Sequence, residues 1–200
     1  MARERKTDRG VRNRIAATAA RIVAEEGADY AFAKKKALRQ VAGRTRANGN
    51  IVPDNSEVED EVRRYNALFL RDSQPARLLQ LRLAALKMMR ELADFHPHLT
   101  GAVLNGTGGE QSEIQLQLFT ENAKDVAIFL LNQGISFDVE ALVTSQKEIT
   151  EIIRFSAENE AFCLTIHTPT AMYRMIKKGR QSAERADASG LMRLIAQDTG

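Results

Sequence analysis

The spacing of apolar residues changes at Pro97, and this change limits the possible folds more than any other feature of the chain. Between residues 9 and 95, apolar residues recur every three or four positions, as on the buried face of an α-helix. From Glu113 to Phe119 they alternate strictly, as in a strand with one buried face. The sequence therefore predicts an α+β fold in which a helical N-terminal portion, residues 1–95, packs on a small mixed-sheet portion, residues 96–200.

The same patterns predict the individual elements. We expect helices over residues 9–26, 32–42, 56–69, 74–95, 122–132, 170–178 and 188–197. We expect strands over residues 99–104, 113–119 and 135–139, and a hairpin over 148–155 and 161–167. Ser56 and Glu59 have the spacing of a capping box at the start of a helix. The first eight residues are expected to be loose, and residues 44–54 are expected to form a loop.

Composition excludes several classes of protein. A chain of 200 residues with 44% hydrophobic and 28% charged residues fits a compact globular protein rather than a disordered one. No apolar run is long enough to span a membrane, and the charged start lacks the apolar core of a secretory signal. A single cysteine, Cys163, cannot form an internal disulfide. We therefore expect a soluble, cytoplasmic protein with no membrane partner and no structural zinc.

Charge is distributed unevenly along the chain. Residues 1–50 hold 13 Lys and Arg against 5 Asp and Glu, a balance of +8, whereas the rest of the chain has a balance of −5. The densest basic run is Lys34-Lys35-Lys36, and Arg39 lies one helical turn after Lys35. These four residues are candidate nucleic-acid contacts. The alternative is an ordinary solvated helix surface, because three consecutive helical residues cannot share one face.

The glycine-rich segment from Leu99 to Phe119 carries the strongest indication of chemistry. It reads as a strand, a connection with several glycines, and then the alternating strand that begins at Glu113. Two side chains at positions i and i+2 of a strand point to the same side of the sheet, so Glu113 and Gln115 are expected to share a face. The alternative is a generic glycine-rich turn between two strands.

This segment resembles the core of the nucleotidyltransferase (polymerase beta-like) superfamily. In that pattern a strand ends in Gly-Ser, a connection of about ten residues follows, and the next strand carries Ser-acid-apolar-acid. Here Gly101-Ala102 falls on the Gly-Ser and Ser112-Glu113-Ile114-Gln115 falls on the second motif. The resemblance covers residues 85–167. It implies that residues 96–200 form a nucleotidyltransferase-like portion, in which paired carboxylates hold Mg²⁺ beside a nucleotide triphosphate.

The chain departs from this pattern at most chemical positions. Ala102 lacks the serine hydroxyl, Gln115 replaces the second acid, and residues 162–167 hold no acid for the third position. Only Glu113 is retained, as a catalytic residue if the protein is active. The resemblance therefore implies a catalytically degenerate scaffold with no metal site, and Mg²⁺ as a cofactor only if the protein is an enzyme.

A degenerate scaffold of this kind is expected to bind a nucleotide or another phosphate compound in a regulatory role. The candidate ligand-binding residues belong to the glycine-rich turn and the start of the next strand: Gly101, Ala102, Asn105, Gly106, Thr107, Gly108, Ser112 and Gln115. Two alternatives stay open. One is a weak or unconventional nucleotidyltransferase that uses Glu113, and the other is a nucleic-acid-binding protein that uses its basic N-terminal helices. A homodimer is compatible with the apolar helices.

Two further resemblances are less informative. The chain is similar to bacterial proteins of uncharacterised role that share Gln74-Pro-Ala-Arg77 and Leu104-Asn-Gly-Thr107. Some are labelled nucleotidyltransferase and others UDP-N-acetylmuramate–alanine ligase, but this chain lacks the ATP loop that such a ligase requires. Residues 15–43 are similar to the first two helices of TetR-type repressors. That similarity ends at Arg44, where the DNA-reading helix would begin.

Overall fold

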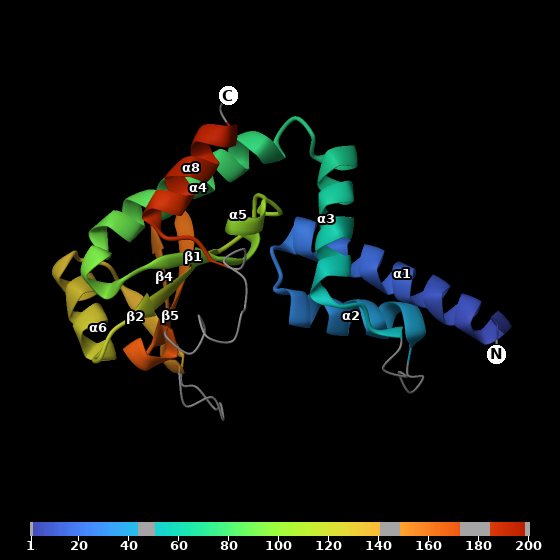
Figure 1. Ribbon diagram of the computed structural model, residues 1–200, viewed down its shortest axis with the longest axis horizontal. Coiled ribbons are helices and arrows are strands. Elements are labelled where there is room, and N and C mark those ends of the chain that lie inside the picture. The colour runs from blue at the N-terminus through green and yellow to red at the C-terminus, as the bar shows by residue number, and fades with distance from the viewer. Residues whose placement is uncertain (1, 44–50, 141–148, 173–184, 199–200) are drawn as a thin grey trace. The chain divides into compact units, whose positions relative to one another are not determined.

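The computed structural model describes residues 2–43, 51–140, 149–172 and 185–198 (Figure 1). It divides into two compact units, of which the first comprises Met1–Arg77 and Thr107–Ser112 and the second comprises Leu78–Gly106 and Glu113–Gly200. Helices dominate the first unit and a mixed sheet forms the second, which confirms the expected α+β class. The division falls within a helix at Arg77, whereas the expected boundary lay at residue 95.

The first unit contains α1 (Ala2–Glu26), α2 (Tyr30–Ala42) and α3 (Asn55–Phe69). Small and β-branched side chains of these helices form its core: Ile15, Ala19, Ala20, Ile22, Val23, Ala33, Ala37, Val58 and Val62. Arg12 of α1 reaches Glu57 of α3, with 2.8 Å between Nε and Oε1. The unit therefore combines a narrow core of small residues with an ion pair between α1 and α3.

The helix ends follow from local chemistry, with two differences from the sequence predictions. α1 begins at Ala2 rather than near Arg9, because Arg, Lys and Glu are good helix formers even without an apolar face. The capping box at the start of α3 consists of Asp54 and Glu57, so the predicted pair of Ser56 and Glu59 is wrong. Asp54 is the residue in extended conformation before the first helical turn, which is what a capping side chain requires.

The second unit is built from α4 (Gln74–Glu91, from Leu78 on), a 3₁₀ turn (Ala93–Phe95), β1 (His98–Thr100) and α5 (Gly101–Asn105). It continues with β2 (Ile114–Phe119), α6 (Ala123–Asn132), β3 (Phe137–Glu140), β4 (Ile149–Ala157), β5 (Glu160–His167) and α8 (Ala188–Asp198). No helix in the described part of the chain is long and apolar enough to cross a bilayer.

The described strands form one sheet in the order β1-β2-β5-β4-β3. β2 and β5 run parallel at its centre, and the other neighbours are antiparallel. Apolar residues of one face pack against α4, α6 and α8, including Ile114, Leu116, Leu118, Leu164, Leu86, Leu130 and Leu191. The alternation of β2 therefore has the predicted meaning, since its apolar residues enter the core and Gln115 and Gln117 stay half-buried on the other face.

The predicted strand over residues 99–104 is wrong from Gly101 onward. β1 ends at Thr100, and Gly101 to Asn105 form the short helix α5. Gly101 has a φ of +71°, which breaks the extended run, and Gly106 ends α5 with a φ of +86°. The predicted strand over 135–139 lies slightly later, at Phe137–Glu140. Residues 170–172 of the helix expected over 170–178 are helical, and the rest of that helix and part of the loop expected over 44–54 lie outside the described residues.

Candidate functional site

Gly101 and Gln115, two of the predicted ligand-binding residues, lie against each other in the second unit. A Cβ on Gly101 would lie 2.4 Å from Gln115 Oε1 and 3.0 Å from Gln115 Cδ. The side chain of Gln115, predicted from the sequence to correspond to the second acid of the nucleotidyltransferase pattern, thus covers the backbone where α5 begins. Only glycine is compatible with this close approach at a positive φ.

Four residues of the glycine-rich turn, Thr107, Gly108, Gly109 and Ser112, are buried in the first unit. Thr107 is 1% exposed, and its hydroxyl lies 3.2 Å from the hydroxyl of Tyr30. The carbonyl oxygen of Gly108 accepts a hydrogen bond of 2.7 Å from Gln74 Nε2, and Ser112 Oγ accepts one of 2.9 Å from the backbone N–H of Gly109. Thr107 and Gly108 thus contact α2 and α4, and Ser112 closes the turn on itself.

The predicted set is consequently divided between the two units. Gly101, Ala102, Asn105, Gly106, Glu113 and Gln115 belong to the second unit, and Thr107, Gly108 and Ser112 belong to the first. Arg82 lies near the end of α5, since a Cβ on Gly106 would lie 3.8 Å from its Nη2.

Glu113, the candidate catalytic acid of the sequence analysis, forms an ion pair with an arginine. Its Oε1 lies 3.4 Å from Nε of Arg154 on β4, and Arg154 also binds Glu140 on β3. Burial raises the pKa of the Glu113 carboxyl, and the charge of Arg154 lowers it by a smaller amount. The hydrogen bond with Glu140 is the main reason that the pKa of Arg154 is raised. Glu140 is therefore the stronger partner of Arg154, and Glu113 is the weaker one.

The parallel pairing of β2 and β5 identifies the residue beside Gln115. Gln115 is paired with Cys163, and Cys163 is paired across β4 with Arg154. Burial, followed by the charge of Glu113, raises the pKa of the Cys163 thiol to about 11. The sheet face that bears the carboxylate of Glu113 thus also carries the amide of Gln115, the neutral thiol of Cys163 and the guanidinium of Arg154.

This donor set does not fit Mg²⁺. A hard divalent cation takes carboxylate and other oxygen ligands, and a guanidinium on the same face repels it. The described residues contain no group of three or more His, Cys, Asp or Glu that could hold a metal ion.

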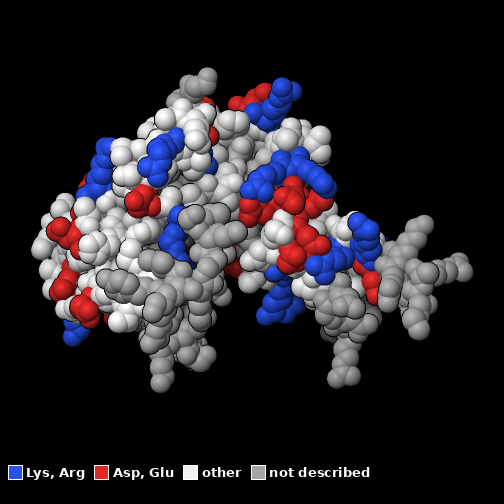
Figure 2. Space-filling view, viewed as in Figure 1, with Lys and Arg blue, Asp and Glu red and all other residues white. Residues whose placement is uncertain are grey.

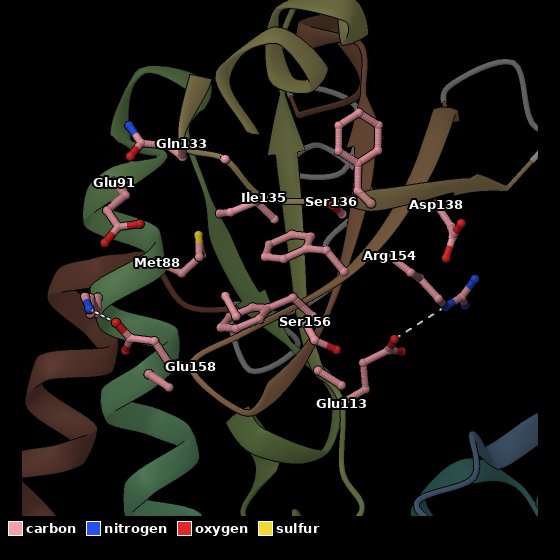
Figure 3. A pocket seen from close by; sticks show the side chains of 18 residues that line it. Met88, Glu91, Glu113, Gln133, Ile135, Ser136, Asp138, Arg154, Ser156 and Glu158 are labelled. Carbon is pink, nitrogen blue, oxygen red and sulfur yellow. Dashed lines mark hydrogen bonds and ion pairs between the residues drawn. The ribbon is translucent and has the colours of Figure 1, made fainter. Parts of the chain in front are cut away.

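A hollow of about 860 Å³ opens between α4 and the strands β3 and β4 (Figure 3). Its apolar part contains Met88, Ile135, Phe137 and the stacked rings of Phe155 and Phe162, whose centroids lie 5.1 Å apart. Figure 3 shows Met88 and Glu91 projecting from α4 on one side, and Asp138, Arg154 and Glu113 on the opposite side. Its size lies within the range of ligand pockets, roughly 300–1,000 Å³.

Charges on the rim of the hollow are mostly acidic. Its described lining contains four acids and two cations: Glu91, Glu113, Asp138 and Glu158, with Lys87 and Arg154. Lys87 forms an ion pair with Glu158 at one end, and Arg154 forms its ion pair with Glu113 at the other. A highly charged anion is therefore disfavoured here, whereas an anion with one or two charges has a single site at Arg154.

The four basic candidates on α2 do not act as one group. Lys34 donates to Asn55 Oδ1 at 2.7 Å, and Lys36 forms an ion pair of 2.6 Å with Glu26. Lys35, Lys36 and Arg39 line a shallow hollow beside Phe32. The structure thus places three of the four on one side of α2 and directs Lys34 toward the start of α3.

Sequence reasoning missed Arg154 and the hollow. A charge in the middle of Ile152-Ile153-Arg154-Phe155 was the available indication, because an isolated arginine within an apolar strand needs a partner. The hollow could not be predicted from the sequence, because it forms only when α4 packs against β3 and β4. Searches against family models, curated proteins and solved structures find no match to this chain.

Proposed function

We propose that the protein is a catalytically degenerate nucleotidyltransferase-like scaffold that binds a nucleotide or a related phosphate compound without metal. The observation that carries the proposal is the ion pair between Glu113 and Arg154 at the edge of the hollow. Glu113 stands at the strand position where the nucleotidyltransferase pattern carries its first metal-binding acid. In this proposal a guanidinium takes the place of the metal as the binder of phosphate.

The fold supports this assignment. β1, a short helix, and the antiparallel β2 follow one another as in the resembled core, and a later strand, β5, runs parallel beside β2. In the resemblance Glu113 and Gln115 correspond to the first two acids, and we assign the third position to Cys163, the neighbour of Gln115 on β5. Since one carboxylate and no other acid stands there, transfer of a nucleotidyl group through two metal ions is not expected.

The chemistry of the hollow favours a ligand with a flat apolar part and a small negative charge. Ile135 and Phe137, the partly exposed apolar residues of the lining, offer surface to a base, and the buried rings of Phe155 and Phe162 lie behind them. Arg154 can exchange its bond with Glu113 for a phosphate, because the desolvated carboxylate of Glu113 is the weaker of its two partners. The acidic rim disfavours a triphosphate without metal, so a nucleoside monophosphate is the preferred ligand class.

Thermal unfolding with nucleoside mono- and triphosphates, each with and without Mg²⁺, tests the proposal. A ligand at 100 times its dissociation constant stabilises the folded state by about 2.7 kcal/mol. For a chain of 200 residues this corresponds to a rise in Tm of about 5–10 °C. We expect such a rise with at least one monophosphate in the absence of Mg²⁺.

Two variants test whether the phosphate of a bound nucleotide lies at Arg154. Arg154→Gln is expected to weaken monophosphate binding by about 10- to 100-fold, the effect of losing a hydrogen bond from a charged donor. Lys87→Gln removes the other cation of the same hollow and is expected to bind nearly as the parent does. Equal losses in both variants would contradict a phosphate site at Arg154.

The remaining outcomes are also decisive. Stabilisation only by triphosphates with Mg²⁺, together with metal-dependent incorporation of labelled nucleotide that Glu113→Ala abolishes, would establish the alternative of an unconventional nucleotidyltransferase. The absence of stabilisation by any nucleotide would refute the proposed ligand class.

A further inference from the structure

One side of α2 combines an exposed aromatic ring with unneutralised cations. Phe32, Lys35, Lys36, Arg39 and Gln40 line a shallow hollow of about 460 Å³ and are called the α2 platform below. Their spacing of three or four residues places them along one stripe of the helix. The platform belongs to the first unit, whereas Arg154 and the hollow described above belong to the second.

Phe32 has no evident role in folding. Its side chain is 53% exposed and does not pack into the described core of the first unit, which the neighbouring Ala33 and Ala37 enter. The ammonium of Lys36 lies 6.0 Å from the centre of the Phe32 ring and is held there by its ion pair with Glu26. The ring is thus held beside a cation while most of its surface faces solvent.

The two other cations of the platform are available to an anion. Among the described residues, neither Lys35 nor Arg39 has an ion-pair partner, and both lie one helical turn apart beside Phe32. The sequence from Tyr30 to Pro53 contains no Asp or Glu at all. The charges over α3 differ, since Arg63 and Arg64 are paired with Glu59, Asp60 and Glu61, and Figure 2 shows acidic and basic side chains mixed there.

We propose that the α2 platform binds single-stranded nucleic acid, with one base stacked on Phe32 and the adjacent phosphates at Lys35 and Arg39. An exposed ring among cations is the arrangement by which proteins bind unpaired strands, because any unstacked base offers a flat face. A duplex keeps its bases stacked internally and offers Phe32 no partner. A membrane surface would require a broader apolar stripe than this single ring.

Fluorescence anisotropy of the full chain with a short labelled oligothymidylate measures this binding directly. Phe32→Ala is expected to weaken binding by about 5- to 100-fold, the usual effect of one base-stacking contact. Phe32→Trp is expected to restore it, because the larger ring stacks at least as well. Circular dichroism of each variant shows whether the fold is intact, which an exposed position favours.

The cations are tested through the salt dependence of binding. Lys35→Gln/Arg39→Gln is expected to make the slope of log K against log salt concentration shallower by about 1.4, since each phosphate contact with a single strand contributes about 0.7. Arg63→Gln/Arg64→Gln removes the same number of charges from α3 and serves as the matched control. Its slope is expected to stay within about 0.3 of the parent value.

Three results would overturn the proposal. The first is equal affinity for the single strand and for a duplex of the same sequence. The second is unchanged affinity of Phe32→Ala, which would indicate a purely electrostatic contact. The third is equal binding to heparin or to vesicles rich in phosphatidylserine with the same response to Phe32→Ala, which would assign the platform to polyanions or membranes in general.

Discussion

The buried guanidinium of Arg82 is expected to be a main source of stability in the second unit. Arg82 is 3% exposed, and it donates from Nε to the carbonyl oxygen of Val103 at 3.0 Å and from Nη2 to that of Leu104 at 3.1 Å. It also forms an ion pair with Asp198 in α8. One side chain of α4 thus fixes the end of α5 and the end of the C-terminal helix.

Arg82→Met keeps most of the apolar stem and removes all three of these interactions. Hydrogen bonds from a charged donor contribute about 1.5–3 kcal/mol each, and the apolar replacement recovers part of the loss because no charge has to be buried. We therefore expect the free energy of unfolding to fall by about 3 kcal/mol and Tm to fall by about 6–12 °C. Differential scanning calorimetry suits this measurement, because it resolves separate transitions if the two units unfold independently.

Asp198→Asn provides the control for the ion pair. The side chain of Asp198 is 37% exposed, so the pair itself is expected to contribute less than about 1 kcal/mol, and the two carbonyl bonds of Arg82 remain. A loss of less than about 0.5 kcal/mol in Arg82→Met would refute the reasoning. An equal loss in Asp198→Asn would show that the ion pair, rather than the bonds to α5, carries the effect.

Three further predictions, two of them for substitutions and one for the reactivity of a thiol, concern the surroundings of Glu113. Because burial raises the folded-state pKa of Glu113, the folded protein binds this proton more tightly than the unfolded chain does, so its contribution to stability falls as pH rises through the raised pKa. Glu113→Gln should therefore have a higher Tm than the parent at neutral pH. At a pH below the ordinary pKa of glutamate the two proteins should have the same Tm. A difference in Tm that does not depend on pH would argue against this. The Cys163 thiol, with its pKa of about 11, should react with Ellman's reagent at pH 8 far more slowly in the folded than in the urea-unfolded protein, and similar rates in both states would exclude its burial. Gly101→Ala should lower the free energy of unfolding by about 1–3 kcal/mol, because residue 101 has a positive φ and its Cβ would meet Gln115, and a neutral effect in urea titrations would show that the turn relaxes freely.

Prediction from the sequence succeeded where a long segment has one regular period. α4 and β2 were expected nearly within their observed bounds, because many apolar positions agree on a period of 3.6 or of 2. α5 was missed, because a helix of five residues that begins with a glycine is too short to show any period. The capping box was displaced by two residues, because Asp54 and Ser56 can both cap and only the backbone conformation distinguishes them.

The site was less predictable than the fold, because its contacts join distant parts of the chain. The burial of Thr107 depends on Tyr30, which lies 77 residues earlier. The partner of Glu113 lies on β4, and nothing close to Glu113 in the sequence indicates it. Local pattern could therefore single out the glycine-rich turn and Glu113 as candidates, but not the guanidinium of Arg154 on the face beside Glu113.

The degenerate-scaffold proposal can also be tested by restoring what the chain lacks. Gln115 and Cys163 are direct neighbours on the parallel strands β2 and β5, and Glu113 lies two residues before Gln115 on the same face. Gln115→Asp/Cys163→Asp/Arg154→Gln would place three carboxylates together without the guanidinium that repels a divalent cation, and their mutual repulsion should lower Tm in a chelating buffer. Since Mg²⁺ or Mn²⁺ binds such a set and relieves that repulsion, either ion should raise the Tm of the variant and leave that of the parent unchanged. Failure of the ions to stabilise the folded variant would show that this face never had the geometry of a metal site, and the resemblance to nucleotidyltransferases would then lose its structural support.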